Sequence, residues 1–197
     1  MVFAFPVANS AKSVTRRGDP HITRYIPPVN TGAGVVATTS DRRTAQILLA
    51  ALAWATAIIH VIAAAHHYEE WVLYGVFFTI LAPAQAIWGG LVFQHPDSRR
   101  IIAIGAIVNL GVAILWAMSR TTGIPIGPTP WQPEAAGWHD VMATINELAM
   151  FGIAAALLGW LPARFAADDA AIARIAKWVA IPLLVISALA ASLAHEH

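Results

Sequence analysis

Apolar and polar residues are segregated along this chain into long blocks rather than alternating at short spacing. The apolar runs cover roughly residues 44–65, 72–93, 101–118, 141–161 and 175–193. Each run is close to the ~20 residues with which an α-helix crosses a ~30 Å hydrocarbon core. The pattern predicts an all-α integral membrane bundle of five transmembrane helices. We divide the chain into a flexible basic cytoplasmic tail at residues 1–43 and a five-helix transmembrane domain at residues 44–197.

The basic residues predict an orientation for this bundle. All Lys and Arg residues except Arg120 lie before the first apolar run, or in and beside the second and fourth gaps between runs. Cytoplasmic loops of membrane proteins are enriched in Lys and Arg, so we expect the N-terminus in the cytoplasm. An odd number of spans then places the C-terminus on the extracytoplasmic side. The expected location is the plasma (cytoplasmic, or cell inner) membrane.

The third gap, residues 119–140, differs from the others in its length and in its richness in Gly, Pro and Trp. Such a composition excludes a regular helix, and we expect an ordered lid on the outer face. Arg120 and Asp140 lie at the two ends of this lid. They are expected to form a structural ion pair that holds it in place.

Composition narrows the class of protein further. The chain is 58% hydrophobic and only 12% charged, which is too apolar for an ordinary soluble domain. It contains no Cys, which excludes disulfides and thiolate metal sites. The net charge is +1, and because the topology accounts for the basic residues, no nucleic-acid partner is expected. The lipid bilayer is the expected partner.

Histidines gather on the predicted outer side and suggest a metal site there. His66, His67 and Glu70 directly follow the first apolar run, and His139 precedes the fourth. Imidazole and carboxylate ligands without thiolates suit copper or zinc. A weaker candidate on the same side is the C-terminal segment His195-Glu196-His197.

A second group of polar residues lies within the spans. At about 1.5 Å of rise per residue, His60 and Glu147 lie at the same depth and Asn109 lies deeper. Glu147 should face the bundle interior, because an ionised carboxylate in hydrocarbon is costly. We expect these three residues to form a second shell around the metal ligands or a path for protons. The alternatives are interhelical glue, a pair of metal ligands, or a polar contact for a quinone or haem, with haem disfavoured because no two histidines lie deep at matching depth on separate helices.

These observations favour a multi-pass membrane protein that handles a transition metal (copper or zinc) or a redox cofactor at its extracytoplasmic side. The alternative is a non-catalytic accessory subunit of a larger membrane complex, in which the polar residues serve as helix-helix glue. Its partners would be other membrane subunits or further copies of the chain. A third class is a small enzyme acting on a lipid-soluble substrate, with His60 and Glu147 as base and acid.

Overall fold

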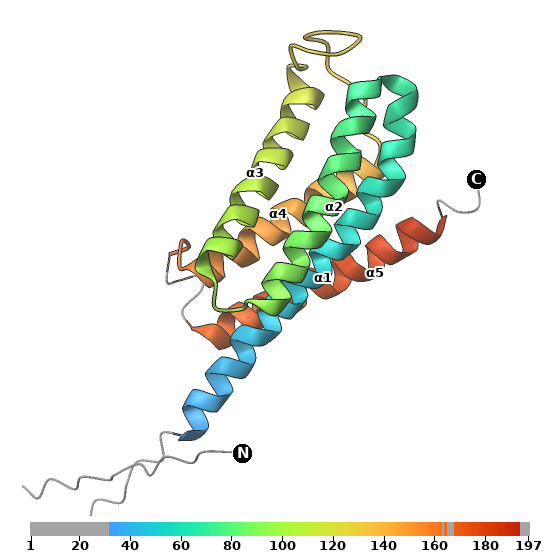
Figure 1. Cartoon of the computed structure of the whole chain (residues 1–197). Coiled ribbons are helices and arrows are strands. Elements are labelled where there is room, and N and C mark those ends of the chain that lie inside the picture. The colour runs from blue at the N-terminus through green and yellow to red at the C-terminus, as the bar shows by residue number, and fades with distance from the viewer. Residues whose placement is uncertain (1–31, 163, 165–167, 194–197) are drawn as a thin grey trace, which may run out of the picture. The chain divides into compact units, whose positions relative to one another are not determined.

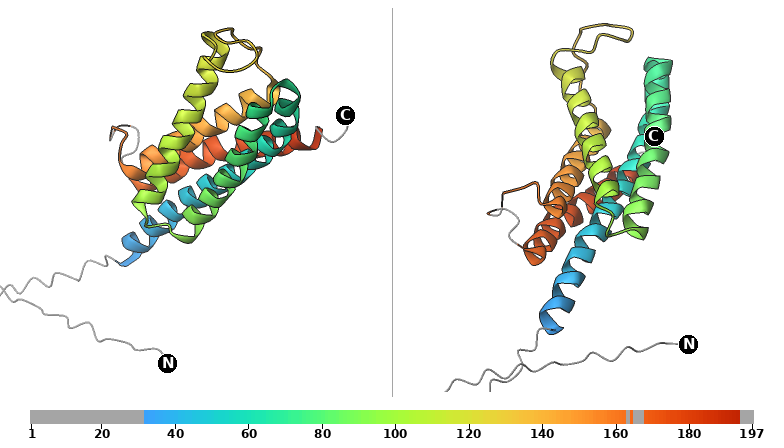
Figure 2. Two further views of the ribbon diagram at one scale, coloured as in Figure 1. Left: turned by 45° about the horizontal axis from the view of Figure 1, so that its top comes forward. Right: turned by 60° about the vertical axis from the view of Figure 1, so that its left-hand side comes forward.

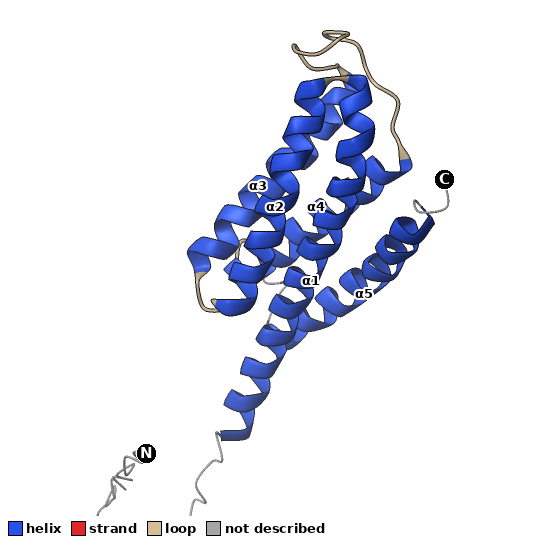
Figure 3. Cartoon of the chain, turned by 45° about the vertical axis from the view of Figure 1, so that its right-hand side comes forward, coloured by secondary structure: helices blue, strands red, loops and turns tan. Residues whose placement is uncertain are grey.

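The computed structural model describes residues 32–162, 164 and 168–193, and within them the chain is helical without β-strands (Figures 1 and 3). The helices are α1 (Gly32–Glu70), α2 (Val72–Gln94), α3 (Arg99–Thr121), α4 (Trp138–Leu158) and α5 (Asp169–Leu193). Each contains a segment long and apolar enough to cross a membrane. The predicted all-α bundle of five transmembrane helices is confirmed for these residues, and the chain is a multi-pass membrane protein.

Two boundaries differ from the sequence prediction. Helix α1 begins at Gly32, so residues 32–43 are helical where a flexible tail was expected. No proline interrupts this stretch, and Arg42 near its end contacts Leu157 of α4 and Asp169 of α5. The loop predicted at residues 119–140 is shortened to 122–137, because α3 and α4 each extend into it. Residues 1–31 of the predicted tail and the His195-Glu196-His197 segment lie outside the described residues.

Helix α1 is the centre of the bundle. It packs against α2, α4 and α5, while α3 packs against α4 (Figures 1 and 2). Many of the buried side chains are alanines, among them Ala53, Ala154 and Ala176. Small side chains let helices approach closely, and close packing is a main source of helix association within lipid.

The outer surface of the bundle is apolar. Large side chains such as Ile80, Ile104 and Trp178 are exposed by 65%, 63% and 78%. Exposed apolar groups on this scale would be costly in water, and they match the hydrocarbon that surrounds a membrane-spanning helix.

Arginines hold the bundle together at the end where α4 finishes. Arg42 of α1 donates a hydrogen bond to the Leu157 carbonyl at 3.0 Å, and Arg99 of α3 donates to the Leu158 carbonyl. The last carbonyls of a helix have no partner within the helix and carry its negative dipole end. The two guanidinium groups therefore cap α4 and attach it to α1 and α3.

Helices α2 and α3 lie close together at their ends away from the α3–α4 loop. They diverge toward the loop (Figure 2). Where they meet, Gln85 donates to Asn109 at 2.9 Å and Trp88 donates to the Ile101 carbonyl at 2.8 Å. Gly105 makes room for this contact, since a Cβ there would lie 1.8 Å from the Trp88 ring.

Candidate functional site

Polar side chains occupy two levels between α1 and α4, near the α3–α4 loop. Depths are counted at ~1.5 Å per residue from the last residue of α1 and the first residue of α4. By this count His67 and Asp140 lie within about 5 Å of those helix ends, and His60 and Glu147 lie about 14 Å from them. The level of each residue follows from its position on a continuous helix.

The deeper level is a pair between two buried titratable groups. His60 Nε2 lies 3.2 Å from Glu147 Oε1, and each residue is only 1% exposed. The His60 ring also lies beside Phe78, with 5.4 Å between the ring centroids. A histidine and a carboxylate that share a hydrogen bond also share a proton that either partner can hold. This pair is thus suited to accept or release a proton far from water.

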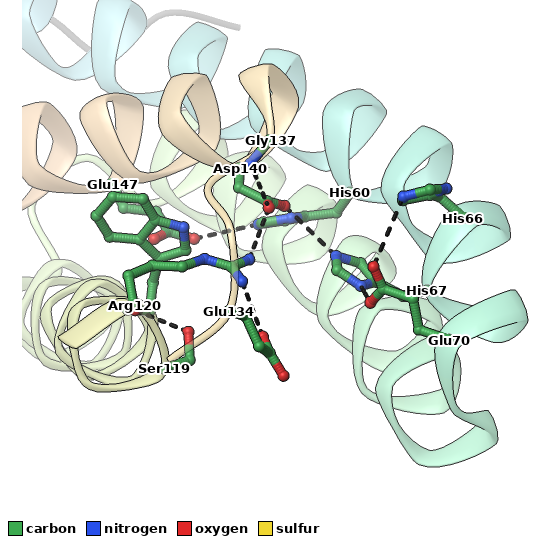
Figure 4. Close-up of polar contacts among 11 residues, drawn as sticks. His60, His66, His67, Glu70, Ser119, Arg120, Glu134, Gly137, Asp140 and Glu147 are labelled. Atoms are coloured by element: carbon green, nitrogen blue, oxygen red, sulfur yellow. Dashed lines mark hydrogen bonds and ion pairs between the residues drawn. The ribbon is translucent and has the colours of Figure 1, made fainter. Parts of the chain in front are cut away.

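The outer level centres on His67, whose two ring nitrogens both face carboxylates (Figure 4). Nδ1 lies 2.7 Å from Glu70 Oε2 and Nε2 lies 3.4 Å from Asp140 Oδ1. The ring stacks on Phe78, with centroids 4.4 Å apart. Phe78 therefore contacts the rings of both His60 and His67 and lies beside both levels.

Arg120 ties the loop to the helices at this level. Its Nη1 donates to Glu134 Oε2 at 2.8 Å and its Nη2 donates to Asp140 Oδ2 at 2.7 Å (Figure 4). Glu134, in the loop, also accepts a hydrogen bond from the Tyr74 hydroxyl of α2 at 2.9 Å. Side chains of α2, α3, α4 and the loop are thereby joined through the Glu134 and Arg120 side chains.

The loop itself closes through backbone contacts. Trp131 donates from its backbone nitrogen to the Ile124 carbonyl at 2.9 Å, and Glu134 does so to the Ser119 carbonyl at 3.0 Å. Gly123 has φ of +72°, and a Cβ on it would lie 2.4 Å from the Gln132 nitrogen. A residue without a side chain is required at this turn. The closed loop holds Glu134 in position toward Arg120.

A cavity of about 180 Å³ lies between the two levels. Its polar lining includes His60 with Glu147, His67 with Asp140, and Arg120 with Glu134. The rest of the lining consists mainly of aromatic and aliphatic side chains from α1–α4 and the loop. Three of its apolar lining residues, Leu73 and Phe77 of α2 and Leu115 of α3, are also 54%, 37% and 39% exposed. The cavity thus reaches the apolar surface of the bundle between α2 and α3.

The four residues expected to bind a metal are gathered only in part, because Glu70 contacts both His66 and His67, at 3.6 and 2.7 Å. His67 and His139 line the cavity, whereas Glu70 is partly exposed and the His66 side chain is 73% exposed, 3.6 Å from Glu70. The His66 and His67 rings lie 6.0 Å apart, but His66 is on the exposed side of α1 and His67 faces the cavity. The described residues contain no group of three or more His, Asp or Glu side chains able to hold a metal ion.

Of the other expected site residues, four form two contacting pairs and Asn109 lies apart from them. His60 and Glu147 are paired, and Arg120 and Asp140 lie in contact at 2.7 Å. Asn109 lies apart from them: it donates to the Gly105 carbonyl at 2.7 Å and accepts from Gln85, joining α2 to α3. Its contacts are those of an interhelical link.

Sequence reasoning missed Glu134 and Tyr74. Glu134 was nevertheless detectable as the only Asp, Glu, Lys or Arg between Arg120 and Asp140. A lone acidic residue in an apolar loop beside a lone arginine is a signal for an ion pair. Tyr74 carried no such signal, because an aromatic residue near the end of a span has an ordinary place at the membrane interface.

Comparison with known protein families, with curated proteins and with solved structures gives no match for this chain. The functional inference below therefore rests on the chemistry and geometry of the described residues.

Proposed function

We propose that the protein binds a small lipid-soluble redox cofactor in the cavity and exchanges a proton with it through His60 and Glu147. The main support is the burial of this pair, with each residue 1% exposed, in a cavity with mostly apolar walls. Polar groups within a span are costly and are often retained for function. An apolar cavity with a few convergent polar groups is the usual form of a small-molecule site.

The lateral position of the cavity supports a ligand that comes from the membrane. Its apolar lining residues Leu73, Phe77 and Leu115 are exposed on the bundle surface between α2 and α3, where lipid chains would lie. A lipid-soluble molecule could enter there without crossing water. At the outer level, partly exposed Glu70 contacts buried His67, which contacts Asp140, so titratable groups connect the surface to the outer part of the cavity lining.

A transition metal is the less favoured form of this hypothesis. Copper or zinc at His66, His67, Glu70 and His139 would need these side chains to converge, and His66 lies on the exposed side of α1. The organic cofactor agrees better with the described geometry.

Retention of a molecule by the purified protein tests ligand binding. Ala143 lines the cavity and is 5% exposed, so Ala143→Leu should fill part of the space. Gly111→Leu is the matched control, because a Cβ at Gly111 meets no atom within 4 Å. Mass spectrometry of organic extracts should detect a compound retained by wild type and Gly111→Leu and reduced in Ala143→Leu. Equal extracts from all three proteins would refute the proposal.

Proton exchange is tested separately with Glu147→Gln, an amide of nearly the same shape that does not ionise. Reduction of the bound compound by electrons from an added chemical donor should be accompanied by proton uptake from weakly buffered solution in wild type. Proton uptake should be slower in Glu147→Gln. An equal rate of proton uptake in both proteins would place the proton exchange at another group.

The orientation of the site is a further part of the proposal. Arg42, Arg43, Arg99 and Arg100 lie at the opposite ends of α1 and α3 from the cavity, so the positive-inside rule puts the cavity on the extracytoplasmic side of the plasma membrane. Because the chain has no Cys, single cysteines can be labelled specifically. An impermeant thiol reagent added to whole cells should label Thr129→Cys and not Asp97→Cys. The reverse pattern would invert the orientation.

An accessory subunit is the second candidate. Two interhelical hydrogen bonds favour it, since Gln85 to Asn109 and Asn146 to Ser187, both at 2.9 Å, join helices as glue. Purification in mild detergent should then yield stoichiometric partner subunits. A single chain with a bound organic compound would favour the cofactor-binding function.

A further inference from the structure

We propose that the ligand of this cavity is an uncharged ring compound with carbonyl oxygens, of the quinone class. This inference rests on the proposed binding function and specifies the chemistry of the ligand. It is drawn from the hydrogen-bonding groups, the charges and the size of the cavity.

The cavity lining carries buried nitrogens that lack a partner. Among the described residues, His60 Nδ1, Trp116 Nε1 and Arg120 Nε are buried without a hydrogen-bond partner, and all three residues line the cavity. An indole nitrogen and a guanidinium Nε are donors only, and a neutral imidazole can donate from Nδ1. A buried donor without an acceptor is costly. A ligand that supplies acceptor oxygens would remove this cost.

The arrangement along α3 suits a single ligand. Trp116 and Arg120 are one helical turn apart and therefore lie on the same face of α3. At ~1.5 Å per residue, Trp116 lies about 7 Å from the end of α3, a depth between the outer level and the His60–Glu147 pair. Two acceptor oxygens at opposite edges of a ligand ring could thus face nitrogen donors of the protein at two different depths.

The charges of the lining disfavour an ionic ligand. Arg120 is already paired with Glu134 and Asp140, at 2.8 and 2.7 Å, and Glu147 adds a third carboxylate. An anion would meet these carboxylates, and Arg120, the only Lys or Arg among the described lining residues, is already paired. A cation would bring hydrogen-bond donors to a lining whose unpartnered nitrogens are also donors. An uncharged acceptor matches the lining in both respects.

The size and walls of the cavity suit one substituted ring. A cavity of roughly 150 Å³ in another protein holds a benzene ring, and this one has about 180 Å³. Phe77 and Phe78 line it and offer faces for stacking. The exposed edge at Leu73 and Leu115 leaves room for an apolar tail to extend into the lipid.

The test compares duroquinone with durene, which has the same ring and four methyl groups without the two oxygens. A third probe, 2,3,5,6-tetramethylbenzoate, adds a negative charge. Each is added to the protein in nanodiscs, and dissociation constants are obtained from the rise of the unfolding midpoint with probe concentration. Trp116→Phe removes one donor and keeps an aromatic ring. Trp71→Phe changes another tryptophan of the same lining and serves as the control.

Wild type should bind duroquinone at least about tenfold more tightly than durene, since each net hydrogen bond changes affinity by about fivefold. Trp116→Phe should weaken duroquinone binding by about fivefold and leave durene binding unchanged. Trp71→Phe should keep the wild-type ratio of the two affinities.

Other results would overturn the inference. Equal affinities of wild type for duroquinone and durene, which need no variant to measure, would show that the oxygens are not recognised. A ratio unchanged by Trp116→Phe would also overturn it, as would tighter binding of the benzoate. In these cases the cavity would still be a binding site. If none of the probes binds and no compound is retained on purification, the proposed function fails as well.

Discussion

Replacing Arg120 by alanine removes the side chain that connects the α3–α4 loop to α4. Arg120 forms two charge-assisted hydrogen bonds, to Glu134 at 2.8 Å and to Asp140 at 2.7 Å. The side chains involved are 13%, 26% and 13% exposed, so solvent screens the pairs only partly. Removing one partner of a fully buried pair costs about 3–5 kcal/mol, and the partial exposure lowers our figure to about 2–3 kcal/mol.

This free energy should appear as opening of the loop, because five continuous helices hold the rest of the bundle. Hydrogen exchange of peptides from residues 122–137, measured in nanodiscs, is the appropriate assay. A loss of about 2–3 kcal/mol corresponds to exchange faster by roughly 30- to 140-fold. A peptide from the middle of α1 serves as the internal control and should be unchanged.

Arg120→Lys separates charge from geometry. Lysine keeps the positive charge but does not reproduce the planar fork that contacts two carboxylates at once. We expect loop exchange between that of wild type and that of Arg120→Ala. If Arg120→Ala inserts normally and its loop exchanges and resists protease like wild type, the ion pairs do not hold the loop and the reasoning is wrong.

Further predictions concern the deep pair, the helix contacts and metals. Glu147→Ala leaves His60 without its partner and opens a cavity, so it should lower the free energy of unfolding by about 3–5 kcal/mol. Glu147→Gln should lower it by less than about 1.5 kcal/mol. Unfolding in mild detergent measures both variants. Gly105→Ala places a Cβ 1.8 Å from the Trp88 ring and should cost at least about 1–3 kcal/mol. Gly111→Ala, where a Cβ meets nothing within 4 Å, should be neutral or stabilising by up to about 1 kcal/mol, and equal melting temperatures for the two variants would contradict this contact. A chelator should leave the melting temperature unchanged, and stoichiometric copper or zinc by elemental analysis would instead support the metal hypothesis.

Part of the site could be predicted because the spans are continuous helices. Counting residues along a helix gives depth, and this placed His60 level with Glu147 and Arg120 level with Asp140. The structure brings each of these pairs into contact. Counting also tells which residues share a face of one helix, but it does not tell which neighbouring helix that face meets. His66 and His67 were each expected to share an ion with Glu70, and both contact Glu70, whereas only His67 also contacts Asp140.

The sequence by itself determined the class of the protein, its five spans and the depth of each polar residue. These properties follow from local composition and from the fixed rise of a helix, and neither depends on how the helices are arranged. Only the tertiary structure decided which polar residues meet. The packing of α1–α4 and the loop forms the cavity, and the closed loop brings Glu134 to Arg120 and Tyr74. Such contacts join residues far apart in the chain and depend on helix packing and loop conformation, which the hydrophobic pattern does not specify.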